Sequence, residues 1–201
     1  MGYRMFAKGL AGFLIGMAVL VGTIVPVPVY AAAKIERVEQ GGNPELDVLF
    51  ETLKAAKTRP EAARVAGEIQ RIWAQSGSDT ADLLMERADE AISNEEFPLA
   101  IEILDRLVVL QPDWAEAWNR RATVFFLTDD YRRSVADIGE VLRLEPRHYG
   151  AISGLGLIYR SMGDDKRAFK AFEQALEIYP QNESVRESLE ELRPSAEGLD
   201  L

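Results

Sequence analysis

The sequence predicts an all-α solenoid of stacked helical hairpins, mainly because it repeats every 34 residues. Pro112, Pro146 and Pro180 are separated by 34 residues and again by 34, and each follows a stretch rich in Leu, Ile or Val. A fixed period near this length that ends in proline is typical of helix–turn–helix arrays. Alignment on the prolines defines three units, at residues 81–114, 115–148 and 149–182.

Equivalent positions of the three units carry similar side chains. Positions 4, 8 and 11 share one face of an α-helix, and positions 20, 24 and 27 share one face of a second, so each unit is expected to be a pair of helices. Small residues at positions 8 and 20 allow these helices to approach closely. Positions 8, 20 and 24 are occupied by Ala88, Ala100 and Leu104, by Ala122, Ser134 and Ile138, and by Gly156, Ala168 and Phe172.

The sequence on either side of the three units predicts further helices. Residues 45–80 keep the apolar spacing of a hairpin, with Pro60 in the first turn of its second helix, and are interpreted as a degenerate N-terminal unit. Residues 183–193 are expected to form a capping helix, which the capping-box pattern Ser184-Val185-Arg186-Glu187 opens. Residues 34–44 are expected to be a flexible linker and residues 194–201 a mobile tail.

Residues 1–33 have the composition of an export signal. Two basic residues precede an uncharged apolar run, Leu10 to Val25, and prolines and then small residues follow. This order is typical of a secretory signal peptide, and cleavage is expected after Ala31 or Ala33. The alternative is an uncleaved anchor in the inner membrane at residues 10–33, because 24 uncharged residues are long enough to span a bilayer. The first interpretation predicts a periplasmic protein.

Composition and charge argue against several classes of function. The net charge is −10 and no basic stripe reverses it, so nucleic-acid binding is not expected. The absence of Cys and the presence of one His, His148, exclude thiol–imidazole catalysis and multi-His zinc sites. His148 is expected to be a surface or inter-repeat contact. Asp129-Asp130 and Asp164-Asp165 recur at the same turn and are interpreted as helix caps. We therefore expect no catalysis, metal, cofactor or small-molecule substrate.

The three units resemble the tetratricopeptide repeat (TPR) family over residues 81–180. The matching residues are the three prolines with Trp118, Leu155, Gly156, Tyr159, Ala168, Phe172 and Ala175. The resemblance implies a right-handed α-solenoid whose concave groove binds a peptide. Arg87 and Arg121 depart from the family pattern at the seventh position, where Leu is usual. Their stems are expected to cover apolar surface while their guanidinium groups reach water.

The resemblance assigns the groove to one face of the first helix of each unit, opposite the core positions. Asn119 can hydrogen-bond an extended peptide through both ends of its amide, and apolar side chains on this face favour a contact surface. For Phe126 and Ile92 the alternative is packing against neighbouring repeats. The expected partner-binding residues are Met85, Asp89, Asn119, Arg120, Thr123, Phe126, Ser153, Leu157 and Arg160.

Together these features predict a non-catalytic scaffold that binds a peptide segment or a helix of another protein. The family's clamp for acidic C-terminal peptides is not carried over, because Met85 and Ser153 stand at its fifth position and acidic residues at its second. A ligand of mixed charge is therefore expected. Two alternatives stay open: self-assembly through the concave or a terminal surface, and a membrane-tethered factor of cell-envelope assembly that retains residues 1–33.

Overall fold

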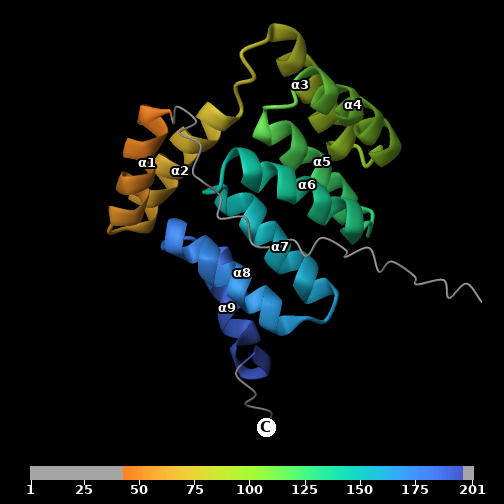
Figure 1. The fold of residues 1–201 in the computed structure, drawn as a ribbon. Helices are drawn as coiled ribbons and strands as arrows, with labels where there is room; N and C mark the ends of the chain where they lie inside the picture. The colour runs from red at the N-terminus through yellow and green to blue at the C-terminus, as the bar shows by residue number, and fades with distance from the viewer. Residues whose placement is uncertain (1–42, 197–201) are drawn as a thin grey trace, which may run out of the picture. The chain divides into compact units, whose positions relative to one another are not determined.

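The computed structural model describes residues 43–196, so the predicted signal peptide and nearly all of the predicted linker lie outside the described residues. This part of the chain contains nine helices and no strand (Figure 1). None of these helices is both long and apolar enough to cross a membrane. They are α1 (Pro44–Ala55), α2 (Arg59–Trp73), α3 (Asp79–Ser93), α4 (Phe97–Leu110), α5 (Ala115–Leu127), α6 (Tyr131–Leu144), α7 (Tyr149–Ser161), α8 (Asp165–Ile178) and α9 (Glu183–Ala196).

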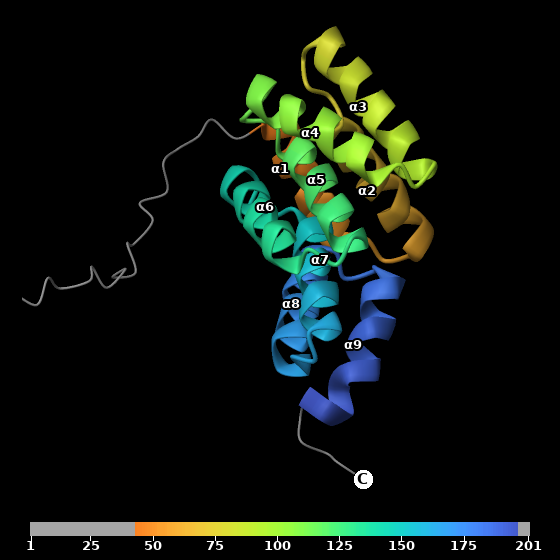
Figure 2. The same ribbon diagram turned by 90° about the vertical axis from the view of Figure 1, so that its right-hand side faces the viewer.

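The three repeat units form three consecutive hairpins, α3–α4, α5–α6 and α7–α8. The helices of each hairpin pack against each other, and each hairpin packs against the next one along the chain (Figures 1 and 2). Helix α9 packs against α8 and buries Val185, Leu189 and Leu192 in one cluster with Phe172. The predicted all-α helical-repeat solenoid is therefore confirmed.

The small and large columns of the repeat compensate each other in volume. Gly156 lies so close to Phe172 that an added Cβ would stand 2.4 Å from Cε1 of the phenylalanine ring. The first two units carry Ala at position 8 and the smaller Leu104 or Ile138 at position 24, and all of these side chains are buried. The largest side chain at position 24 thus requires the smallest residue at position 8, because the core is close-packed.

The turns inside the second and third units are closed by aspartate caps. The side chains of Asp130 and Asp164 accept hydrogen bonds from the backbone N–H groups of Arg133 and Arg167, both at 3.0 Å. These hydrogen bonds hold the pKa of both carboxyl groups below the usual value, because the ionised form is the acceptor. The interpretation of the acidic pairs as helix caps is confirmed at these two residues.

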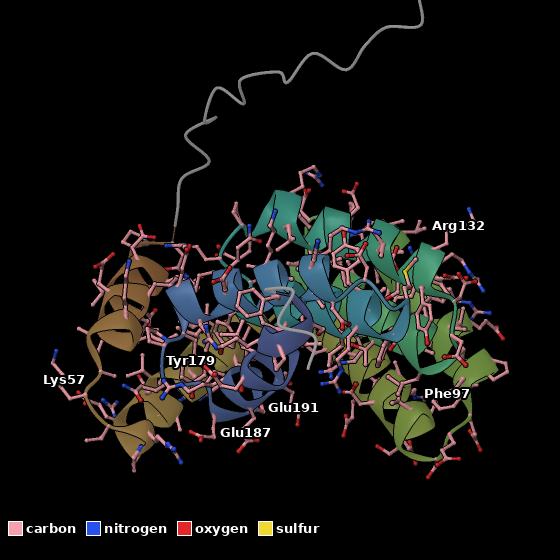
Figure 3. The ribbon with its side chains drawn as sticks, turned by 90° about the horizontal axis from the view of Figure 1, so that it is seen from below. Lys57, Phe97, Arg132, Tyr179, Glu187 and Glu191 are labelled. Atoms are coloured by element: carbon pink, nitrogen blue, oxygen red, sulfur yellow. The ribbon has the colours of Figure 1, made fainter. Side chains whose placement is uncertain are left out.

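The N-terminal hairpin, α1 and α2, does not stack on α3 as a preceding repeat would. It packs instead against α8 and against the turns that join the repeat units. In Figure 3, Lys57 in the turn of the hairpin and Phe97 at the start of α4 lie at opposite ends of the described part of the chain. Tyr179 lies beside the hairpin. The expectation of a further stacked unit at the front of the solenoid is therefore wrong in its placement.

Aromatic stacking anchors the N-terminal hairpin in this place, and a hydrogen bond and two ion pairs also connect it to the repeat units. The ring of Trp73 stacks on the ring of His148 with centroids 4.1 Å apart. The backbone carbonyl oxygen of Trp73 accepts a hydrogen bond from Nε1 of Trp114 at 2.7 Å. Ion pairs join Asp47 to Arg147 at 2.6 Å and Arg59 to Glu183 at 2.5 Å. The hairpin thus contacts all three junctions at which one unit ends and the next helix begins.

Two details of the C-terminal helix differ from the expectation. The cap of α9 is Asn182, whose Oδ1 accepts a hydrogen bond from the N–H of Val185 at 3.3 Å, and Ser184 lies inside the helix. The helix also continues past Pro194 to Ala196, so the first residues of the expected tail are helical. The first difference has a local cause, because an Asn side chain reaches the free N–H groups as well as Ser does.

The guanidinium of Arg121 does not reach water as its sequence position suggested. It forms a two-point ion pair with Asp137 on α6, with Nε–Oδ2 at 2.7 Å and Nη2–Oδ1 at 2.8 Å. The side chain of Asp137 is 7% exposed and that of Arg121 is 15% exposed, so the pair is shielded from solvent. The hydrogen bonds to Asp137 raise the pKa of Arg121. Arg87, in contrast, is exposed as expected.

Candidate functional site

A cavity of about 310 Å³ lies between α5 and α7 and includes five of the nine residues predicted to bind a partner. The five are Asn119, Thr123, Phe126, Ser153 and Leu157. The other lining residues are Ala122 and Leu127 of α5, Ser134 and Ile138 of α6, and Gly150, Ala151, Gly154 and Ile158 of α7. We call this surface the α5–α7 groove.

The α5–α7 groove combines an apolar floor with a polar margin. The floor contains Phe126, Ile138 and Leu157, whereas Asn119 and Thr123 supply polar groups. The Thr123 hydroxyl donates to the Asn119 carbonyl at 3.0 Å, and the Asn119 amide nitrogen donates to Oε2 of Glu116 at 3.1 Å. The amide oxygen of Asn119 accepts no hydrogen bond from the described residues. It is therefore available to a backbone N–H of a ligand.

Small residues on α7 keep the groove open. Gly150, Ser153 and Gly154 all line the cavity from this helix. A Cβ at Gly154 would lie 3.5 Å from Cδ1 of Ile138, an ordinary van der Waals contact, so the packing of the fold does not require glycine there. Since glycine inside a helix costs roughly 1 kcal/mol relative to alanine, its presence is better explained by the space it leaves in the groove.

A second cavity of about 370 Å³ adjoins the first and is lined in part by the N-terminal hairpin. The two cavities share Asn119 and Gly150. The second is more polar, since its walls include Glu116, Arg120 and His148. Helix α2 and the residue after it contribute Gln70, Trp73 and Ala74 to its far wall. The hairpin therefore forms an end wall for the groove, which the sequence did not predict.

His148 is an inter-repeat contact and is 2% exposed, so the surface alternative is wrong. Its Nδ1 accepts a hydrogen bond from the N–H of Ala151 at 3.1 Å and thereby caps α7. An acceptor Nδ1 places the ring proton on Nε2, which faces Oε2 of Glu116 at 3.4 Å. Both ring nitrogens have structural partners, and the stacking on Trp73 completes the burial.

The other four predicted site residues lie outside the α5–α7 groove. Met85 is 8% exposed and belongs to the same core cluster as Trp114 and Ala117. Arg160 does not line the cavity and pairs with Glu191 of α9 at 3.1 Å. The expectation that Met85 is exposed in the groove is therefore wrong.

Arg120 and Asp89 form an ion pair beside the second cavity. Nε of Arg120 lies 3.0 Å from Oδ1 of Asp89, and Nη2 lies 3.2 Å from Oε1 of Glu116. Burial raises the pKa of the Asp89 carboxyl, and the positive charge of Arg120 opposes this. One cation thus serves two carboxylates, so this end of the groove carries a small excess of negative charge.

For Phe126 and Ile92 the expected roles are lining of the groove or packing against neighbouring repeats, and the structure shows the role of each residue. Ile92 packs against a core cluster that joins the first unit to Ala117 and Val124 of the second, which agrees with the packing alternative. Phe126 does both, because it packs against the core cluster of the second unit and also lines the α5–α7 groove. Sequence reasoning missed Ser134, Ile138 and Gly154, since the groove was assigned by one face of the first helices alone.

The fold and the groove define a helical-repeat protein of the kind that binds other proteins, and comparison with known proteins identifies its family. The chain is 40% identical to a TPR repeat-containing protein of Rhizobium etli over 200 residues, which is 97% of each chain. Models of the tetratricopeptide repeat match residues 85–131 and 150–182. The chain belongs to the TPR repeat family.

Solved structures with the same fold include TPR domains bound to peptides. The first TPR domain of Spaghetti (RPAP3), bound to an HSP90 peptide, has a TM-score of 0.55 and 19% identity over 57% of this chain and 91% of that one. The type III secretion chaperone SycD of Yersinia enterocolitica, in complex with a peptide of the translocator YopD, has a TM-score of 0.55 and 14% identity over 59% of this chain and 95% of that one.

TPR repeats are non-catalytic protein-interaction modules, and this chain is therefore a protein-interaction scaffold rather than an enzyme. Among the described residues no group of three or more His, Cys, Asp or Glu is arranged to hold a metal ion.

Proposed function

We propose that the α5–α7 groove binds a segment of a partner protein and inserts one apolar side chain of that segment between α5 and α7. The observation that carries the proposal is the cavity itself, with Phe126, Ile138 and Leu157 below and the amide of Asn119 at the margin. A pocket that is mostly apolar and has a few fixed polar groups suits one anchoring side chain and its backbone. Affinity of micromolar order, about −8 kcal/mol, is expected for such a segment.

The second cavity favours a partner segment of mixed charge. A segment that continues past the anchor meets Glu116 and Arg120, which already compensate each other at 3.2 Å. With Asp89 beside them, no uncompensated cation is available for an acidic terminus. A polar or weakly basic residue next to the apolar anchor fits this end of the groove best.

We further propose that the protein acts in the periplasm, on the basis of residues 1–33. A cleaved signal peptide would release a chain that begins at Ala32 or Lys34. Mass spectrometry of the N-terminus of protein isolated from cells tests this. A chain that retains its apolar run would instead support the membrane-tethered alternative.

Replacement of Thr123 by Trp is expected to block the groove and weaken partner binding by about 100-fold, or ~2.7 kcal/mol. Thr123 is exposed, and its hydroxyl donates to the Asn119 carbonyl of its own helix, so an indole there fills the cavity and removes no core contact. Affinity capture of partners from a periplasmic extract, followed by titration of the captured partner, measures the effect.

The matched control is Thr80→Trp, at an exposed position on α3 outside both cavities. It adds the same side chain to the surface and should leave affinity unchanged. Thermal unfolding of both variants should follow the wild type, because surface substitutions usually change stability by less than about 0.5 kcal/mol. Equal binding by Thr123→Trp and wild type would overturn the proposal.

A further inference from the structure

The carboxylate of Glu116 contacts three donor groups in the wall of the second cavity. Its Oε2 accepts a hydrogen bond from Nδ2 of Asn119 at 3.1 Å and lies 3.4 Å from Nε2 of His148. Its Oε1 pairs with Nη2 of Arg120 at 3.2 Å. The Glu116 side chain is 13% exposed, so these groups replace most of the water around the carboxylate.

An acid is not required at this position to build a hairpin of the repeat. Position 2 of the third unit is Gly150, and the first turn of α7 contains no acidic residue. A carboxylate in the first turn of a helix does stabilise the helix, but this effect needs no contact with a neighbouring side chain. The three donors around Glu116 therefore indicate a second role.

Two of the donors hold the carboxylate, one at each oxygen. Nδ1 of His148 accepts the N–H of Ala151 at 3.1 Å, so the ring proton lies on Nε2 and faces Oε2 of Glu116. The stack on Trp73, with 10° between the two rings, fixes the plane of the imidazole. Arg120 holds the other oxygen.

The carboxylate in turn fixes the amide of Asn119. An ionised carboxylate accepts hydrogen bonds and donates none, so the amide turns its NH2 group towards Oε2 of Glu116. The reverse orientation would place the amide oxygen against a carboxylate oxygen, and two acceptors repel each other. Asn119 lines both cavities, and its oxygen is the end of the amide that accepts no hydrogen bond from the described residues.

We infer that Glu116 is a positioning residue of the binding site. It holds the Asn119 amide with its oxygen free, so that the partner segment meets a fixed acceptor and supplies the N–H donor. This inference rests on the proposed function, because it needs a segment in the α5–α7 groove. Glu116 acts through Asn119 and lowers the cost of ordering that side chain when the segment binds.

A double-mutant cycle separates this role from a purely structural one. The probe is the partner protein that the wild-type chain captures from a periplasmic extract, purified and titrated against each variant. Glu116→Ala should weaken binding about 10-fold, because an amide that turns freely loses most of the contribution of one hydrogen bond. In the Asn119→Ala background the same substitution should change the affinity by less than about twofold. Equal losses in the two backgrounds, or no loss in either, would overturn the inference.

The amide of Asn119 can also be observed in the free chain by NMR. Its side-chain amide hydrogens should exchange with water faster in Glu116→Ala than in the wild type. The matched control is Glu173→Ala, at an exposed position of α8 outside both cavities, and should leave this exchange unchanged. Exchange that stays the same in Glu116→Ala would contradict the role of Glu116.

The inference and the proposed function fail in different ways. If Thr123→Trp binds the partner as well as the wild type does, the proposed function is wrong. If Thr123→Trp blocks binding but the losses from Glu116→Ala and Asn119→Ala are additive, the groove binds the segment and only the role of Glu116 is wrong.

Discussion

Replacement of Trp73 by Ala is expected to detach the N-terminal hairpin and to lower the free energy of unfolding by about 3–5 kcal/mol. The Trp73 ring contacts His148 at 4.1 Å, Tyr149 at 5.3 Å and Phe50 at 5.9 Å between centroids, so its removal empties the centre of the aromatic cluster. Few helix-to-helix contacts connect the hairpin to the rest of the described part. The remaining ion pairs involve exposed side chains and contribute little.

Hydrogen exchange measures this effect element by element. In the Trp73→Ala variant, amide protection should fall in α1 and α2 and should persist in α5–α8. Val48→Ala, at an exposed position of the same hairpin, is the control and should change neither protection nor stability. Retained protection of α1 and α2 in Trp73→Ala would show that the aromatic cluster does not anchor the hairpin.

Replacement of Arg121 by Leu, the residue that the family prefers at this position, is expected to lower the free energy of unfolding by about 3–5 kcal/mol. The substitution leaves the Asp137 carboxylate buried at 7% exposure without its two-point partner. It also removes the guanidinium from the Trp118 and Phe125 rings, at 4.9 and 5.7 Å from their centroids. A substitution that restores the residue preferred by the family is therefore expected to destabilise this chain.

The third unit shows how the damage can be repaired. It carries Leu155 and Ala171 at the positions of Arg121 and Asp137. The double variant Arg121→Leu/Asp137→Ala should therefore recover most of the stability lost in Arg121→Leu, because no buried charge is left unpaired. Asp105, which Arg121 also contacts at 2.8 Å, is 56% exposed and stays hydrated. Urea denaturation of the two single variants and the double variant measures the coupling. Additive losses would contradict the account of a coupled buried pair.

The repeat units could be predicted from the sequence because their packing is periodic. Gly156 and Phe172 illustrate this, since each occupies a repeat position at which the size of the side chain is limited by its neighbour in the same unit. The placement of the N-terminal hairpin could not be predicted. It depends on Trp73 meeting His148 and Tyr149, which lie more than 70 residues away and follow no repeat column. The Arg121–Asp137 pair was missed for the same reason, because it replaces the usual apolar contact in one unit only.

The groove was predicted in part, and the omissions have a geometric cause. Asn119, Thr123 and Leu157 were found because they lie on one face of α5 or α7. Ile138 was missed because the floor of the cavity extends to the second helix of the unit. Met85 was misassigned because the equivalent position of α3 belongs to the core cluster of the first unit. Helical periodicity identifies a face, but neighbouring elements decide which part of that face is open.

The most direct test of the central claim is photochemical crosslinking from the groove in living cells. A photoreactive phenylalanine derivative at Thr123 lies at the margin of the α5–α7 groove, and the same group at Thr80 lies on α3 outside it. The proposed function predicts a crosslink to a different protein from Thr123 and none to that protein from Thr80. A crosslink from Thr80 but not from Thr123 would contradict it.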